Sequence, residues 1–222
     1  MMSHLTFAAL ASQLTAVGRR FHARGWALGT SGNFSAVLGR DPMRLAITAS
    51  SVHKGEMADS HVLEVDEFGK VVSGSGSPSA ETMLHVEIVR RFGAAAGSVL
   101  HTHSVWGTIL SGAHRDGVSI EGFEMLKGLA GVGTHEHREW IPIIDNDQDV
   151  PRMACAAGAA LEQHPAAHAF LIRKHGLYTW GQTLADAERH VEIFEFLFET
   201  VGRTASFSAR IEEAYHGVIE NS

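Results

Sequence analysis

The chain is poor in residues that form covalent cross-links, with one cysteine among 222 residues. Cys155 cannot form a disulfide within the chain, which fits a reducing compartment such as the cytoplasm, and we expect it to pack as a small side chain in a helix. No apolar run approaches the length of a membrane span, and residues 1–5 lack the charged and apolar parts of an export signal. We therefore expect a cytoplasmic protein without a membrane partner.

An excess of positive charge is also missing, because 25 acidic residues outnumber 18 basic ones and the formal net charge is -7. This balance gives no general attraction to nucleic acids or acidic lipids, so neither is an expected partner and local basic residues must provide any anion binding. The Gly-x-Ser-x-Gly, Walker and dinucleotide-binding fingerprints are absent. The chain therefore lacks the motifs that serine hydrolases, nucleotide hydrolases and Rossmann dehydrogenases require.

The chain does contain enough apolar material, 45% of its residues, for one compact α/β domain over residues 1–222. Four strand patterns between residues 34 and 73 indicate a meander, after which helices and strands alternate. This order favours a central mixed, largely antiparallel sheet with helices on both faces. We expect a core over about 5–202 and a loosely held tail after Gly202.

The individual elements follow from the spacing of apolar residues and from helix-capping residues. The expected helices cover 6–24, 79 or 80 to 92, 105–113, 123–127, a segment capped by Asp149 that ends near 164, and a segment capped by Thr183 that ends near 201. Ser79 is the expected cap of the second helix. The expected strands cover 34–38, 45–48, 62–65, 70–73, the residues around His101, 140–143 and two segments flanking Gly176.

Three histidines carry the strongest chemical signal. His101 and His103 follow the apolar pair Val99-Leu100, and His175 follows a second apolar run. Alternate side chains of a strand leave the same face, so His101 and His103 can share a divalent metal. His175 would add a third ligand and leave a coordination position free, as in catalytic zinc sites. In a chain with 15 histidines, a pair at this spacing can also arise by chance.

Three hydroxyl-rich loops, over residues 29–33, 48–55 and 76–81, indicate an anion site. Their glycines let the backbone approach an anion, and a serine at the start of a helix lies where the helix dipole favours negative charge. Together the loops could hold one phosphate monoester. They offer several serine and threonine hydroxyls, the carboxamide of Asn33 and the cation of Lys54. Taken alone, a serine-glycine loop is more often a plain turn, and Lys54 more often a solvated lysine.

Two carboxylates are candidates for proton transfer. Glu81 falls in the expected first turn of a helix beside the third loop, where a glutamate is also favoured by the helix dipole alone. Glu124 lies between an apolar segment and a glycine-rich turn, where desolvation could raise its pKa enough for acid/base chemistry. An ordinary surface glutamate is an equally good interpretation of Glu124.

Five motifs, taken in order, resemble the class II aldolase/adducin family. They are Gly29-Thr30-Ser31-Gly32-Asn33, Ile47-Thr48-Ala49-Ser50-Ser51, Pro78-Ser79-Ala80-Glu81, His101-Thr102-His103 and Arg173-Lys174-His175-Gly176. The match covers roughly residues 5–202. Segments 124–128, 140–146 and 175–181 are most similar to the dehydratase branch of the family.

The resemblance implies a class II aldolase-like fold and one Zn²⁺ per subunit, held by His101, His103 and His175. It also implies a homotetramer with sites at subunit interfaces and a small phosphorylated ketose as substrate. The implied phosphate contacts are Asn33, Ser50, Ser51 and Ser79, with Lys54 as a helper. The implied reaction is the zinc-dependent dehydration of 5-methylthioribulose 1-phosphate to 2,3-diketo-5-methylthiopentyl 1-phosphate in methionine salvage.

The same resemblance leaves two questions open. In aldolase relatives the glutamate matching Glu81 lies near the metal and moves protons, whereas in the dehydratase branch the glutamate matching Glu124 is the acid/base; both are present here. A sugar-phosphate aldolase or pentose-phosphate 4-epimerase would use the same loops, and a non-catalytic adducin-like assembly domain would lack the metal histidines. Aldolase relatives also use a C-terminal tyrosine, which we do not equate with Tyr215.

Overall fold

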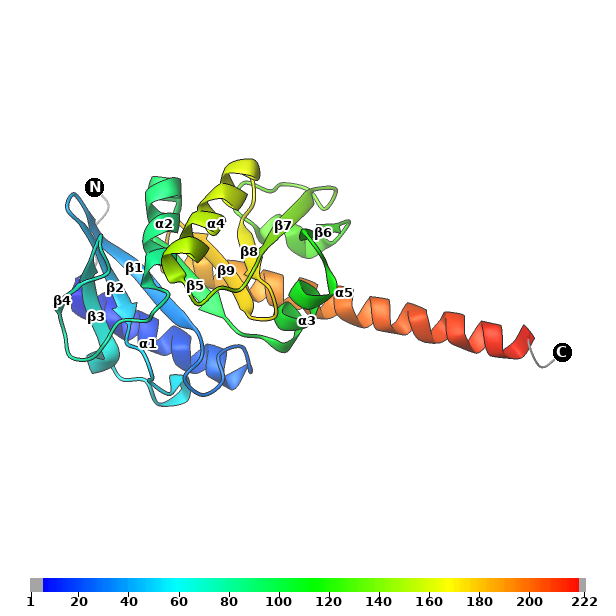
Figure 1. Ribbon diagram of the computed structural model, residues 1–222, viewed down its shortest axis with the longest axis horizontal. Helices are drawn as coiled ribbons and strands as arrows, with labels where there is room; N and C mark the ends of the chain where they lie inside the picture. Colours follow the sequence, from blue (N-terminus) through cyan, green and yellow to red (C-terminus); the bar gives the residue numbers. More distant parts are fainter. Residues whose placement is uncertain (1–5, 220–222) are drawn as a thin grey trace.

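The computed structural model describes residues 6–219, with side chains up to residue 208. In this part of the chain, nine strands form one sheet in the order β4-β3-β2-β1-β5-β9-β8-β7-β6 (Figure 1). The strands are β1 (Asn33–Arg40), β2 (Met43–Thr48), β3 (Val62–Asp66), β4 (Val71–Ser73), β5 (Ser98–Thr102), β6 (Gly117–Glu121), β7 (Arg138–Ile144), β8 (Ala169–Ile172) and β9 (Gly176–Gly181). Only the β7–β8 pair is parallel, so the predicted mixed, largely antiparallel sheet is confirmed.

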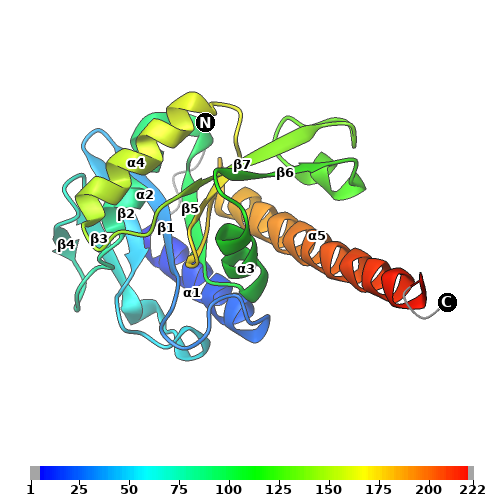
Figure 2. The same ribbon diagram turned by 45° about the vertical axis from the view of Figure 1, so that its right-hand side comes forward.

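Helices cover both faces of the sheet, as predicted (Figures 1 and 2). One face carries α1 (Phe7–Ala23), α3 (Val105–Ala113) and α5 (Leu184–Ile219), and the other carries α2 (Thr82–Phe92) and α4 (Val150–Gln163). Adjacent residues of β5 divide between the two layers, because Leu100 packs with α1 and α5 while Val99 packs with α2 and α4. Between residues 6 and 219, four short 3₁₀ helices connect these elements: η1 (Lys54–Glu56), η2 (Asp59–His61), η3 (Gly93–Ala95) and η4 (Glu124–Gly128).

Local capping explains where three of the helices begin. The side chain of Thr6 accepts a hydrogen bond from the backbone N–H of Ala9, and Asp149 accepts one from Arg152 at the start of α4. Thr183 accepts one from the N–H of Asp186, whose carboxylate accepts in return from the N–H of Thr183. The predicted caps of α4 and α5 are therefore confirmed.

Three local expectations are wrong. Ser79 does not cap α2, because its carbonyl accepts from the N–H of Thr82 in a turn and the helix begins only at Thr82. Cys155 is exposed on α4 rather than packed. The last helix does not end near residue 201 but continues to Ile219 and projects away from the sheet (Figures 1 and 2).

Within residues 6–219, no helix has both the length and the apolar character needed to cross a bilayer. The expectation about an export signal concerns residues 1–5, which lie outside the described residues, as does the side chain of Tyr215.

Candidate active site

Strand register places the central residues of the site in one row across the sheet. Asn33 of β1 lies opposite His101 of β5, and His101 lies opposite Tyr178 of β9. The rings of His101 and Tyr178 stack at 4.0 Å with an interplanar angle of 14°. Glu81, at the start of α2, lies beside this row and accepts a hydrogen bond from the side-chain amide of Asn33.

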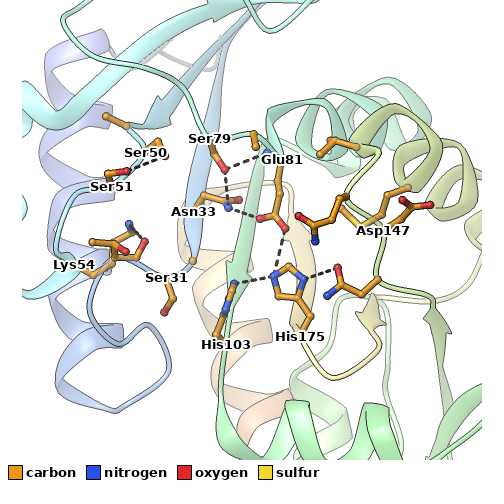
Figure 3. Close-up of a pocket in the computed structure, with 18 residues that line it drawn as sticks. Ser31, Asn33, Ser50, Ser51, Lys54, Ser79, Glu81, His103, Asp147 and His175 are labelled. Atoms are coloured by element: carbon orange, nitrogen blue, oxygen red, sulfur yellow. Dashed lines mark hydrogen bonds and ion pairs between the residues drawn. The ribbon is translucent and has the colours of Figure 1, made fainter.

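The three predicted histidines meet at their Nε2 atoms. The Nε2 of His103 lies 2.7 Å from that of His101 and 3.1 Å from that of His175, and the remaining pair is 3.3 Å apart. The two carboxylate oxygens of Glu81 lie 3.4 Å from the Nε2 atoms of His101 and His175 respectively. Figure 3 shows Glu81, His103 and His175 converging at one end of a pocket. These four residues offer donor atoms that all lie within 4.8 Å of one another.

The donor set fits a divalent metal ion. With Zn–N bonds of about 2.0–2.1 Å, two nitrogens of a tetrahedral site lie about 3.3 Å apart, close to the spacing of these rings. The Nδ1–H of His101 donates to the carbonyl of Leu177 at 2.9 Å. The Nε2 of His101 therefore carries no hydrogen, and its lone pair faces the cluster. Burial, together with the neighbouring histidines, lowers the pKa of His103 to about 2 and that of His101 well below its usual value. Both rings are therefore neutral and able to ligate.

His175 reaches the cluster from the tight turn between β8 and β9. Lys174 has a left-handed backbone with φ of 53°, and the N–H of His175 donates to the carbonyl of Ile172. The next residue must be glycine, because a Cβ on Gly176 would lie 1.9 Å from the carbonyl oxygen of Thr102. This close approach of β9 to β5 brings His175 beside His101.

A buried hydrogen-bond chain orients Asn33. The hydroxyl of Ser35 bonds to Nδ1 of His85 at 2.7 Å, and Nε2 of His85 bonds to the side-chain oxygen Oδ1 of Asn33. The amide nitrogen of Asn33 then donates to Glu81 at 2.8 Å and to Ser79 at 3.1 Å. Burial lowers the pKa of His85 to about 4, despite the opposing effect of Glu81, so this ring is neutral and acts as a hydrogen-bonding link between Ser35 and Asn33.

The five predicted phosphate-binding residues all line one cavity of about 320 Å³ next to the histidines (Figure 3). They are Asn33, Ser50, Ser51, Lys54 and Ser79. Lys54 is 1% exposed, and its ammonium donates to the carbonyls of Thr30 and Val52 at 3.1 Å each. Burial lowers the pKa of Lys54 to about 8. The interpretation of Lys54 as a solvated lysine is therefore wrong.

Glu124 does not lie in this cavity. Its side chain is 74% exposed on η4, and its carboxylate accepts a hydrogen bond from Lys127 at 2.7 Å. The hydrogen bond and charge of Lys127 lower the pKa of Glu124. The expectation that desolvation raises the pKa of Glu124 is therefore wrong for the single chain. Within one chain, Glu81 lies beside the histidines and Glu124 does not.

Several site residues were not identified from the sequence. His85 lies four residues after Glu81, on the same face of α2, and this helical spacing is a signal that could have found it. Tyr178 is buried near Glu81 and Asn33, yet its hydroxyl makes no hydrogen bond of ordinary geometry with any residue that the structure describes. The far wall of the cavity consists of Asn146, Asp147, Gln148, Val150 and Met153.

Three imidazoles and one carboxylate form a site that fits a divalent metal ion, and the adjoining cavity of hydroxyls and a lysine fits a small anionic ligand. This combination is typical of a metal-dependent enzyme. A family model described as the Class II Aldolase and Adducin N-terminal domain matches residues 12–201. The chain belongs to this family, as its five motifs predicted.

The chain is also similar to two named enzymes and to one solved structure. The chain is 45% identical over 198 residues to the methylthioribulose-1-phosphate dehydratase of Methylococcus capsulatus, covering 89% of this chain and 95% of the relative. It is 44% identical over 200 residues to the enzyme of that name from Pseudomonas aeruginosa, covering 90% and 96% respectively. A solved structure of an L-fuculose 1-phosphate aldolase superposes with a TM-score of 0.75 at 23% identity, covering 92% of this chain and 90% of that one, which shows the shared fold.

Proposed function

We propose that the protein is a methylthioribulose-1-phosphate dehydratase acting in methionine salvage. The observation that carries this proposal is the cluster of Glu81, His101, His103 and His175 beside a cavity lined by hydroxyls and a lysine, in a chain 45% identical to a relative of that name. The substrate would be 5-methylthioribulose 1-phosphate. Loss of the C3 proton and the C4 hydroxyl, followed by tautomerisation, gives the 2,3-diketone.

We propose Zn²⁺ as the ion, because three imidazoles with one open side are typical of catalytic zinc. When bound, such an ion supplies positive charge that stabilises negative charge developing on the ketose oxygens. His101, His103 and His175 would hold it, while Glu81, fixed by Asn33, adds negative charge to the same cluster. Metal analysis of the purified protein should give about one Zn²⁺ per chain without added metal.

The cavity residues would bind and orient the phosphate. The hydroxyls of Ser50, Ser51 and Ser79 can donate to phosphate oxygens, and the Lys54 ammonium adds the only buried positive charge of the cavity lining. Holding the phosphate at this end sets how far the ketose carbons extend towards the histidines. Binding energy away from the reacting carbons is thereby used to position them.

We propose that Glu124 moves the protons from a neighbouring copy of the chain in a homotetramer. A single chain leaves its own Glu124 exposed and outside the cavity, so the carboxylate can reach a site only if another copy packs against η4. Exposed apolar side chains surround a second cavity beside η4 and would be covered by such a contact. They are Leu28, Val105, Met125 and Phe196.

The second cavity is also linked to one of the metal ligands by a backbone hydrogen bond. Trp26, which lines it, accepts a hydrogen bond through its carbonyl from the N–H of His103 at 2.8 Å. A neighbouring copy seated there would therefore lie next to the segment that carries His103. Desolvation at that contact would raise the pKa of Glu124, as proton transfer requires. The cytoplasmic location expected from the single cysteine stays a prediction.

A substrate panel tests the reaction. Purified protein is incubated in parallel with methylthioribulose 1-phosphate, fuculose 1-phosphate and ribulose phosphate, and products are followed by mass spectrometry and NMR. We expect loss of one water from the first compound and no reaction with the others. Cleavage of fuculose phosphate would identify an aldolase, and inversion of ribulose phosphate an epimerase; either result would contradict the proposed dehydratase.

Replacing Lys54 with methionine should lower kcat/KM about 10- to 100-fold, mainly through KM, because one charge-assisted contact to phosphate is worth about 1.5–3 kcal/mol. The ammonium is charged below its pKa of about 8 and neutral above it, so kcat/KM of the wild type should fall as the pH rises through about 8. This alkaline fall should be absent in the K54M variant. The measurement is a pH profile of kcat/KM.

Lys70→Met is the matched control, because the side chain of Lys70 is exposed and lies outside the cavity. Its pH profile should match that of the wild type. If K54M kept the alkaline fall in kcat/KM, Lys54 would not be the titrating phosphate ligand.

A further inference from the structure

A second histidine–carboxylate cluster lies at the start of β7, on different residues from the first. Nε2 of His137 lies 2.7 Å from Oε2 of Glu139, and Nδ1 of His168 lies 3.0 Å from the same oxygen. The three donor atoms fall within 4.8 Å of one another. Glu139 is 1% exposed, whereas His137 and His168 are 26% and 18% exposed at their side chains. The cluster therefore has a buried anion and two rings that reach solvent.

The outer contacts of the cluster hold its donor atoms in place. His168 bonds through Nε2 to the carbonyl of Ala130 at 2.8 Å, which directs its Nδ1 towards Glu139. The other oxygen of Glu139 accepts from the backbone N–H of His168 at 2.9 Å, which leaves Oε2 facing both rings. A backbone carbonyl on the far nitrogen is the usual arrangement around a metal-ligating histidine.

The cluster opens onto a cavity of about 710 Å³ that is separate from the phosphate cavity. His137 and His168 line it, together with Ala130, Gly131 and His190, whereas none of His101, His103 and His175 does. His190 is not itself free to ligate, because its two ring nitrogens bond to the backbone of Ala130 and Trp180. Solvent in the cavity can supply further ligands to an ion held by the cluster.

We propose that His137, Glu139 and His168 bind a second divalent transition metal ion, of the Zn²⁺ class, in addition to the ion of the first cluster. Two imidazoles and one carboxylate with open positions suit Zn²⁺ and its neighbours in the first transition row, and exclude a preference for Mg²⁺ or Ca²⁺. The ion would join β7, the residues before β8 and, through Ala130, the loop after η4. Its structural effect would thus extend towards the segment that carries Glu124.

The alternative explanation is that Glu139 and His168 form an ion pair that shares a proton and binds no metal. Burial disfavours charge on Glu139 and on His168, but their mutual hydrogen bond and attraction prevail, so the pKa of Glu139 is lowered and that of His168 raised. A proton shared in this way can satisfy Glu139 without a metal. An incoming ion would have to displace that proton, so the two accounts differ in the number of metal ions bound at saturation.

The test is metal content after equilibrium dialysis against micromolar free Zn²⁺, measured on the full chain. We expect two Zn²⁺ per chain for the wild type, and one each for His137→Gln and His168→Gln. His135→Gln is the matched control, because His135 is an exposed histidine of the same segment outside the cluster, and it should retain two. His103→Ala should also retain one ion, which separates this site from the first cluster and from the proposed reaction.

One ion per chain in the wild type, or two ions in both H137Q and H168Q, would overturn the proposal in favour of the ion pair. Circular dichroism checks that each variant folds, and the partly exposed His137 keeps the test available if H168Q does not fold. As a second measurement, Co²⁺ added to H103A should give visible d–d absorption that is lost in the H103A/H137Q double variant. Unchanged absorption would likewise contradict the proposed site.

Discussion

Replacing His103 with alanine is expected to remove the metal ion of the first cluster and to lower kcat roughly 10³-fold or more. His103 is the ring whose Nε2 lies closest to both other ligands, at 2.7 Å from His101 and 3.1 Å from His175. Without it, only two of the three proposed ligands remain, because Glu81 already accepts a hydrogen bond from Asn33 and is not one of the three. The charge that stabilises the ketose oxygens is lost with the ion. Metal analysis without added Zn²⁺ and initial rates with methylthioribulose 1-phosphate measure the two effects.

His114→Ala is the control for this loss, because His114 is an exposed histidine at the end of α3 and lies outside both clusters. Its metal content and rate should equal those of the wild type. A metal-free H103A variant that still turned over at the wild-type rate would show that dehydration here does not need the ion.

The parts of the site that were predicted are those encoded locally. His101 and His103 are two residues apart at the end of a strand, and such spacing alone places both rings on one side. Ser50, Ser51 and Ser79 lie in loops that are recognisable from their own glycines and hydroxyls. These motifs can be recognised without knowing which strands are neighbours, since each depends on a few consecutive residues.

Apart from His85, the features that were missed depend on contacts between distant segments. Tyr178 enters the site only because β9 pairs with β5 in a register that sets it opposite His101. Lys54 was predicted as a phosphate contact, but its burial was not: its ammonium reaches the carbonyl of Thr30 in another loop, and the burial lowers its pKa. The prediction for Glu124 assumed desolvation, but its exposure is decided by whatever packs against η4, which no pattern within one chain describes.

Replacing Glu124 with glutamine should lower kcat about 10²- to 10⁴-fold while leaving the metal content unchanged, because an amide can neither accept the C3 proton nor deliver it to the leaving hydroxyl. Glu162→Gln is a close control: Glu162 is 77% exposed and paired with Arg91, much as Glu124 is 74% exposed and paired with Lys127. E162Q should keep the wild-type rate. Near-normal turnover in E124Q would remove Glu124 from the acid/base role.

Mixing two inactive variants tests whether Glu124 acts on a neighbouring copy. In tetramers reassembled from equal amounts of E124Q and H103A, a site is intact only where an E124Q chain holds the metal and an adjacent H103A chain supplies Glu124. Random assembly creates that combination at about one site in four, so about a quarter of the wild-type rate should return. If Glu124 served its own chain, every site would carry one defect, and mixed tetramers would be as inactive as their parents. The recovered activity therefore tells whether Glu124 acts on a neighbouring chain or on its own chain, because the mixture contains the same chains and the same total metal under either arrangement.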